Sequence, residues 1–302
     1  MKVILTGGTG FIGRAVSEAL AQKGHEVIIL TRQPSKSEEP GIRLHHRYWN
    51  PPEPDHGQNE IDGAGAVINL AGEPVVAKRW TRKQKLKILE SRCDATQALA
   101  HAIQKAKSRP QVLINASAVG YYGPRDDGAV TEQEAPGNDF LAHVCKAWEA
   151  HAIRVEDFGV RAVRLRIGVV LAKGGGALAK MIPPFRLFLG GPLGNGRQWM
   201  SWIHREDVVG LILFSLANAK VRGALNAASP NPVTMKEFAE TLGKVMHRPS
   251  AATVPAFVLK ILLGEMADML LTGQKVIPAK ALDLGYQFRY PVLQQALEAI
   301  LR

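Results

Sequence analysis

Three glycines near the amino terminus have the spacing found in loops that bind a pyrophosphate. Gly7, Gly10 and Gly13 form the pattern G-x-x-G-x-x-G between an apolar run and a helical pattern. The missing Cβ atoms permit a tight turn and close approach of a phosphate, while the next helix presents free N–H groups. The string alone also occurs in turns without a ligand. Its place between a strand and a helix predicts a dinucleotide site.

The end of the second apolar run indicates which dinucleotide is bound. A site for NAD usually has Asp or Glu about 20 residues beyond the glycines, where the carboxylate accepts from the ribose 2′-hydroxyl. Here the chain reads Leu30-Thr31-Arg32, without a carboxylate. The Arg32 guanidinium can donate to a 2′-phosphate and stack beside adenine. We therefore expect NADP(H) as the cofactor; the alternative is that Arg32 is a solvated surface residue.

A glycine- and proline-rich segment, residues 173–202, carries side chains suited to an organic anion. Loops of this length inside compact domains are often binding loops. Apolar, aromatic and guanidinium groups together suit an anionic or phosphorylated substrate placed over the nicotinamide. The predicted substrate contacts are Met181, Phe185, Arg186, Arg197, Trp199 and Trp202. The alternative for the two tryptophans is that they pack the segment, and His204 and Asp207 are expected to begin the following helix.

Alternating strands and helices must position these residues. Short runs rich in Val, Ile and Leu alternate with helical patterns, and their continuous apolarity suits parallel strands buried on both faces. Expected strands are residues 2–6, 26–30, 66–70, 111–117, 160–167 and 224–228, with a short one near 43–49. Expected helices are residues 11–23, 83–106, 140–157 and 205–217. The fold class is α/β, a Rossmann-type doubly wound parallel sheet with a smaller C-terminal substrate lobe.

The same pattern predicts the domain organisation. We expect an NADP-binding Rossmann domain over residues 1–172, completed by about 203–230. Residues 173–202 and 231–302 are expected to form the smaller substrate-binding lobe. Within that lobe, the apolar stretch 254–271 is interrupted by Lys260, Glu265 and Asp268, so it predicts a packed helix and not a membrane span.

Composition and charge exclude several classes of protein. Of the 302 residues, 46% are apolar and 22% are charged, which is typical of a globular protein and excludes a disordered chain. The glycines at the start interrupt any secretory signal. Two cysteines, Cys93 and Cys145, provide neither a disulfide framework nor a zinc site. We expect a cytoplasmic protein without metal and without membrane contact that binds a small-molecule substrate, with a homodimer as one expected assembly.

The formal net charge of +11 favours anionic ligands. Much of it lies in one basic run that has no compensating acid: Lys78, Arg79, Arg82, Lys83, Lys85 and Lys87. Nucleic-acid binding would require interleaved aromatic residues and a motif that enters a groove, and only Trp80 is near. We therefore interpret the run as a solvated helix face.

At this point the chain resembles the extended branch of the short-chain dehydrogenase/reductase superfamily, which contains NAD(P)-dependent epimerases and dehydratases. It is most similar to the atypical "epimerase family" subgroup, the YfcH-like or SulA-like set, whose tail is a domain of unknown function. The glycine loop and Asn69-Leu70-Ala71-Gly72-Glu73-Pro74 are superfamily-wide features. Residues 117–123, 180–186 and 202–207 are specific to the subgroup.

The resemblance implies a set of cofactor contacts. These are Gly7, Thr9, Gly10, Phe11, Ile12 and Gly13 in the loop, Thr31 and Arg32 at the adenosine end, and Leu70, Ala71, Gly72, Arg92 and Val170 elsewhere. Arg92 also lies beside an apolar stripe of Leu86, Leu89, Cys93 and Leu99, at the edge of the helix face expected to point toward the sheet.

Catalysis in the superfamily uses a Ser after the fifth strand and a Tyr-x-x-x-Lys pair on the next helix, where the Lys lowers the pKa of the Tyr phenol. By resemblance, Ser117 and Lys146 take the first and last of these roles. The residue four before Lys146 is Ala142, so the Tyr is missing. Tyr121, Tyr122 and His143 are the substitutes; each tyrosine could instead pack the turn. We favour Tyr121 as the catalytic phenol.

Two functions remain open. The first is an NADP(H)-dependent oxidoreductase or epimerase acting on an unidentified small substrate that is anionic or resembles a sugar nucleotide. The second is a non-catalytic NADP(H)-binding regulator that docks on another protein, for instance in cell division as the family's alternative name suggests. The first explains both site regions, whereas the second explains the missing Tyr.

Overall fold

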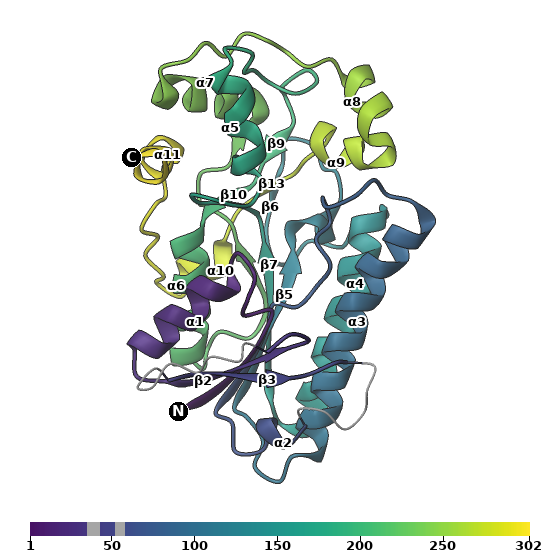
Figure 1. Ribbon diagram of the computed structural model, residues 1–302, viewed down its shortest axis with the longest axis vertical. Coiled ribbons are helices and arrows are strands. Elements are labelled where there is room, and N and C mark those ends of the chain that lie inside the picture. Colours follow the sequence, from purple (N-terminus) through teal and green to yellow (C-terminus); the bar gives the residue numbers. More distant parts are fainter. Residues whose placement is uncertain (35–42, 52–57) are drawn as a thin grey trace.

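A seven-stranded sheet forms the centre of the computed structural model, which describes residues 1–34, 43–51 and 58–302 (Figure 1). The strands lie in the order β11-β7-β5-β4-β1-β2-β3, and every neighbouring pair is parallel. Their bounds are β1 Lys2–Thr6, β2 Glu26–Thr31, β3 Leu44–Tyr48, β4 Ala66–Asn69, β5 Val112–Ala118, β7 Arg161–Ile167 and β11 Gly223–Ala227. The chain order reverses between β1 and β4, where sheets of this kind bind ligands beyond the strand ends. The predicted Rossmann-type α/β fold is confirmed.

Helices cover both faces of the sheet (Figure 1). On one face lie α1 Gly13–Gln22 and α6 Arg205–Ala217; on the other lie α3 Arg82–Lys105 and α4 Phe140–Ile153, the latter extended by η2 Arg154–Phe158. The short α2 Gln58–Ile61 precedes β4. Residues of the inner strands β1, β4 and β5 are buried almost without interruption, because helices exclude water from both sides. This burial explains the continuous apolar runs of the sequence.

A second hydrophobic core lies beyond the strand ends. It joins α5 Leu178–Arg186, α7 Met235–Met246 and α11 Leu293–Leu301 around the fully buried Trp202. The short strands around it are β8 Val169–Leu171, β9 Trp199–Met200, β10 Trp202–His204 and β12 Val233–Thr234. The remaining elements are η1 Val119–Tyr122, β6 Ala129–Val130, α8 Ala256–Leu263, η3 Gly264–Ala267, α9 Asp268–Leu271, β13 Lys275–Val276 and α10 Ala279–Asp283. The domain boundaries stay a prediction, and Ala281 of the tail packs into the core of the main sheet.

The stretch 254–271 differs from the packed helix that its apolarity predicted. It is broken into α8, η3 and α9, with Gly264 at a φ of +61° between the first two. Only Leu259, Met266 and Ala267 are buried in it, while Phe257, Ile261 and Leu262 are strongly exposed. The pattern alone could not predict this exposure, because it depends on which elements pack against α8, and none of those that the structure describes covers that face. In the part of the chain that the structure describes, no helix meets the length and apolarity needed to cross a bilayer.

Candidate functional site

The glycine loop after β1 forms the turn that the spacing predicts. Gly7 has a φ of +70°, and a Cβ on it would lie 2.5 Å from the Leu70 carbonyl oxygen at the end of β4. The Gly10 N–H donates to the Gly7 carbonyl at 3.0 Å, and a Cβ on Gly13 would collide with the same oxygen. Helix α1 starts at Gly13 with neither a side-chain cap nor an acid in its first turn. The first turn of α1, which has no acid and on which Arg14 is exposed, can therefore accept an anion.

The end of β4 brings four predicted cofactor residues together. Leu70 and Ala71 face the glycine turn, and Gly72 packs against Arg92 of α3, whose Cζ would lie 3.0 Å from a Cβ there. Arg92 donates to the Glu73 and Ile88 carbonyls, each at 2.9 Å. Burial lowers the pKa of the Arg92 guanidinium, against the opposing charges of nearby groups. Arg92 is thus held rigidly beside the predicted cofactor path.

The apolar stripe proposed for Arg92 needs correction. Leu86 is exposed, and the buried face of α3 runs instead through Ile88, Ala95 and Leu99. Residues 88, 92, 95 and 99 follow the three- and four-residue steps of one helix face.

A buried network of hydrogen bonds connects the carboxyl-terminal ends of β1 and β4 with β5. The Thr6 hydroxyl donates to Asn69 Oδ1 at 2.6 Å, and Asn69 Nδ2 donates to Thr96 Oγ1 at 2.9 Å and to Asn115 Oδ1 at 2.6 Å. Trp148 Nε1 of α4 also donates to Thr96 Oγ1, at 2.9 Å. All four polar residues are fully buried. The network joins β1, β4, β5, α3 and α4, so it fixes the strand ends relative to one another.

At the end of β2, Arg32 is exposed, and its side chain has no hydrogen bond or ion pair with any residue that the structure describes. Thr31 Oγ1 accepts from the Gln33 N–H at 3.3 Å, which turns the chain at this point. The Arg32 guanidinium is therefore free to meet an anionic group.

Phe11 connects the glycine loop to the second core. A Cβ on Gly176 would lie 3.1 Å from the Phe11 ring and 3.0 Å from the Val170 carbonyl oxygen. The Arg205 guanidinium lies 5.1 Å from the centre of the same ring. Thus Phe11, Val170 and the Gly174–Gly176 turn lie together. Thr9 and Gly10 of the glycine loop are exposed, and the contacts of these residues with a cofactor stay a prediction.

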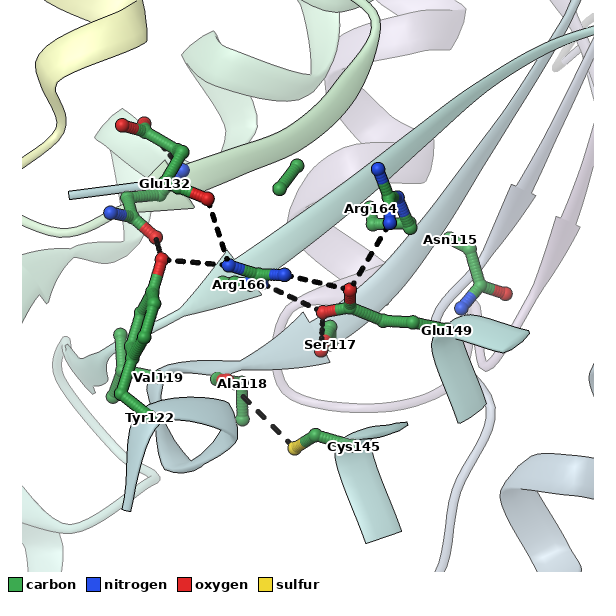
Figure 2. Close-up of polar contacts among 12 residues, drawn as sticks. Asn115, Ser117, Ala118, Val119, Tyr122, Glu132, Cys145, Glu149, Arg164 and Arg166 are labelled. Carbon is green, nitrogen blue, oxygen red and sulfur yellow. Dashed lines mark hydrogen bonds and ion pairs between the residues drawn. The ribbon is translucent and has the colours of Figure 1, made fainter. Parts of the chain in front are cut away.

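Ser117 lies at the end of β5, where Figure 2 shows it beside Glu149 of α4. Its Oγ donates to Glu149 Oε1 at 2.7 Å. Arg166 of β7 donates to the same carboxylate, from Nε to Oε1 at 2.8 Å and from Nη2 to Oε2 at 2.9 Å. All three side chains are buried. Burial lowers the pKa of Arg166, but the hydrogen bonds and charge of Glu149 raise it above its usual value, so the guanidinium stays cationic. The catalytic role of Ser117 stays a prediction; in this structure its hydroxyl proton is engaged by Glu149 inside the protein.

The two tyrosines of η1 have different surroundings. Tyr122 is fully buried, donates to Asn226 Oδ1 at 2.6 Å and accepts from Arg166 Nη1 at 2.9 Å (Figure 2). Burial raises the pKa of Tyr122 to about 12. Tyr121 is half-buried, its ring centre lies 3.4 Å from the Arg166 Cζ, and its hydroxyl has no hydrogen bond to a described residue. Of the two phenols, only that of Tyr121 is free to meet a ligand.

The other two predicted proton-transfer residues of α4 point elsewhere. Lys146 and His143 are exposed, and Lys146 has no hydrogen bond or ion pair within the described ranges. Its neighbour Cys145 takes the buried face, with Sγ 3.8 Å from the Ala118 carbonyl oxygen. Burial raises the pKa of the Cys145 thiol to about 11. The structure therefore does not bring Lys146 to Ser117, because one residue along a helix turns the side chain by about 100°.

Two of the six predicted substrate contacts are core residues. Phe185 and Trp202 are buried, and Trp202 Nε1 donates to the Asn231 carbonyl at 3.0 Å. These two predictions are wrong, and for Trp202 the packing alternative holds. Met181 is half-buried and packs against the same core.

The other three predicted substrate contacts keep accessible groups. Trp199 is half-buried, and its Nε1 donates to Asp127 Oδ1 at 2.8 Å. Arg186 and Arg197 are exposed and form no ion pair with the residues described.

Two residues, Glu149 and Arg166, lie at the centre of the buried polar cluster that contains Ser117 and Tyr122, and the sequence analysis did not select them. A signal was present, because Arg164 and Arg166 interrupt the apolar run of β7, and a charge buried in a sheet needs a partner. Glu132 and Asn226 complete the cluster: the Glu132 carbonyl accepts from Arg166 at 3.3 Å, and Glu132 Oε1 accepts from the Asn226 N–H at 3.0 Å. The residues that contact Glu149 and Arg166 lie far from them in the sequence, so residue spacing could not reveal the cluster.

Comparison with known proteins identifies the class. The family model "NAD dependent epimerase/dehydratase family" matches residues 3–228, and a "domain of unknown function" model, DUF1731, matches residues 254–300. The chain belongs to the NAD dependent epimerase/dehydratase family. The predicted resemblance is confirmed.

Individual relatives match over the whole chain. The chain is 44% identical to the "Epimerase family protein SDR39U1 homolog, chloroplastic" of Arabidopsis thaliana, covering 100% of this chain and 87% of the relative. It is 40% identical to the epimerase family protein YfhF of Bacillus subtilis, covering 100% and 98%. A crystal structure of human epimerase family protein SDR39U1 with NADPH matches with a TM-score of 0.88 at 37% identity, covering 99% of each chain.

Proposed function

We propose that this chain is an NADP(H)-dependent oxidoreductase or epimerase that acts on a small anionic or sugar-nucleotide-like substrate. The observation that carries the cofactor choice is the exposed Arg32 guanidinium at the end of β2, which has no partner among the described residues and stands where a carboxylate would select NAD. The glycine turn against Leu70, with the uncapped start of α1, supports a pyrophosphate at the same edge. The similar human protein that was crystallised with NADPH supports the same cofactor.

The proposed chemistry uses the free phenol of Tyr121. NADPH, when held at this edge of the sheet, would supply the hydride for a substrate carbonyl carbon. Tyr121 is the group that donates the proton to the carbonyl oxygen. Arg166, stacked on the Tyr121 ring and gripped by Glu149, holds the phenol in place. Arg186 and Arg197 attract the anionic part of the substrate.

Binding of the two nicotinamide cofactors tests the cofactor choice. Fluorescence titration should show that NADPH binds the wild type more tightly than NADH. Arg32→Ala should weaken NADPH binding by about 1.5 to 3 kcal/mol, because charge-assisted hydrogen bonds to the 2′-phosphate are lost, and leave NADH binding unchanged. Lys23→Ala, which removes an exposed cation at the other end of α1, is the control. Equal affinities that Arg32→Ala does not alter would contradict the proposal.

A second function, a non-catalytic NADP(H)-binding regulator, is favoured by one observation. The Ser117 hydroxyl is engaged by Glu149, and Lys146 lies on the outer side of α4, so the usual proton-transfer residues are not assembled. Oxidation of NADPH by the purified protein, measured with a panel of carbonyl compounds and sugar nucleotides, separates the two. Turnover of any member supports the enzyme; no turnover, together with a partner protein that binds only when NADPH is present, supports the regulator.

A further inference from the structure

Six large apolar side chains of the second lobe project into solvent. Leu187, Phe188 and Leu189 follow α5, and Phe257, Ile261 and Leu262 belong to α8. Each is between 59% and 70% exposed, whereas no other exposed large apolar side chain of the described residues exceeds 51%. Side chains that line a groove are partly covered by its walls, so such exposure indicates projecting elements. Contiguous exposed apolar surface of this kind marks an interaction site.

Phe188 is placed there at a cost to the fold. It has a φ of +61°, one of two non-glycine residues with positive φ in the described chain. It ends α5 at the position where glycine is usual, with the Leu189 N–H donating to the Pro184 carbonyl at 2.9 Å. A bulky residue in this conformation is strained. The fold therefore retains an exposed aromatic side chain where glycine would suit the backbone better, which points to a role outside folding.

Backbone and side-chain contacts link the segments that carry the two apolar groups. The Ala252 N–H donates to the Gly190 carbonyl at 3.1 Å, which joins the segment after Leu189 to the segment that leads into α8. The Arg248 guanidinium lies 4.7 Å from the Phe188 ring centre. Figure 1 shows α5, α7 and α8 together at the end of the molecule opposite α2. We call this surface, residues 180–189 with 248–262, the lobe tip.

The charge of the lobe tip has one sign. Its charged residues are the cations Lys180, Arg186, Arg248 and Lys260, and the flanking parts of residues 173–202 and 241–264 add Lys173, Arg197 and Lys244 and no carboxylate. All seven side chains are exposed. The C-terminal end of α8 meets the basic run at the start of α3, because Arg79 lies against Gly264 and Lys85 pairs with Glu265 at 2.6 Å. The carboxylates that follow α8, Glu265 of η3 and Asp268 of α9, pair with Lys85 and Lys260.

We propose that the lobe tip binds the surface of an anionic phospholipid bilayer. Projecting leucine, isoleucine and phenylalanine side chains enter the boundary between headgroups and acyl chains, and the surrounding lysines and arginines attract the lipid phosphates. A second copy of the chain is disfavoured as the occupant, because it would bring surfaces of the same charge together. The prediction of no membrane contact was based on the lack of a span, and surface binding requires none. The inference does not rest on the proposed enzyme activity, although Arg186 and Arg197 take part in both, and the variants that test it leave these two residues unchanged.

Co-sedimentation with vesicles tests the inference on the full chain. The wild type should pellet with vesicles of phosphatidylcholine and phosphatidylglycerol, at least about tenfold more strongly than with phosphatidylcholine alone. The double variants Phe257→Ser/Ile261→Ser and Arg248→Glu/Lys260→Glu should each lower binding at least about tenfold. Ile153→Ser/Leu282→Ser, which alters exposed apolar residues outside the lobe tip, should bind as the wild type does.

Phe188→Gly separates lipid binding from folding. Because glycine relieves the positive φ, the melting temperature should be equal to or higher than that of the wild type, while vesicle binding falls. The inference is overturned if the wild type does not bind the mixed vesicles, or if these variants bind as the wild type does. It is also overturned if they change only the oligomeric state, which would indicate self-association, or only turnover, which would indicate a wall of the substrate cleft.

Discussion

Arg166 connects more of the candidate site than any residue chosen from the sequence. Its guanidinium reaches Glu149, the Tyr122 hydroxyl and the face of the Tyr121 ring. A planar cation with five donors can make all of these contacts at once, which lysine could not. Because Glu149 also holds Ser117, the pair links β5, β7, α4 and η1 at the level of the strand ends.

Tyr121→Phe should lower turnover by about 10²- to 10⁴-fold once a substrate is known, because general acid catalysis contributes about that factor. NADPH affinity should stay nearly constant, since the phenol does not hold the cofactor. Steady-state kinetics with a fluorescence titration measures both quantities.

Tyr122→Phe serves as the comparison. It removes a hydroxyl buried between Arg166 and Asn226, so it should lower the free energy of unfolding by about 1 to 3 kcal/mol. If Tyr121→Phe keeps full turnover while Tyr122→Phe or His143→Ala abolishes it, the acid is assigned wrongly and the enzyme proposal survives.

At the scale of elements, the start of α6 is formed as the sequence predicts. His204 caps the helix, with Nδ1 accepting from the Glu206 N–H at 3.2 Å, and its ring lies 4.0 Å from that of Tyr290. Burial lowers the pKa of His204 to about 4. The folded protein therefore keeps this imidazole neutral at a pH where the unfolded chain binds a proton.

This difference predicts how stability changes with pH. Between about pH 6.5 and pH 4 the unfolded state binds more protons at this position, so the free energy of unfolding falls as the pH falls. His204→Asn keeps a cap and removes the titrating group. The free energy of unfolding, measured by urea denaturation at about pH 7 and about pH 5, should therefore decrease less for the variant than for the wild type. An equal loss in both proteins would exclude His204 as the source.

At the scale of the whole molecule, hydrogen bonds to Asp207 hold the C-terminal tail against α6, one of the helices that cover the main sheet. The carboxylate of this α6 residue accepts from the Arg289 N–H at 2.7 Å and from the Tyr290 N–H at 3.0 Å. Burial raises the pKa of Asp207, although these hydrogen bonds act in the opposite direction. Residues between β13 and α11 are thereby fixed against the sheet before the chain returns to the second core.

Asp207→Ala should lower the free energy of unfolding by about 1 to 3 kcal/mol, because it leaves the partly buried N–H groups of Arg289 and Tyr290 without their acceptor. Urea denaturation measures this loss. Glu206→Ala is the matched control: its ion pair with Arg289, at 2.6 Å, is exposed and should contribute little. Similar losses in both variants would show that charge near Arg289, and not the buried hydrogen bonds, holds the tail.

The sequence by itself determined the parallel sheet, the glycine turn after β1 and the place of Arg32. Each depends on local spacing, because a buried strand must be apolar and a tight turn must lack Cβ atoms. Only the tertiary structure decided that Cys145 and not Lys146 faces β5, that Trp202 is buried, and that α8 exposes its apolar face. The direction of a helix side chain changes by about 100° per residue, and its burial depends on elements far away in the chain. The Glu149–Arg166 pair is decided in the same way, because its charges meet only when β7 and α4 pack together.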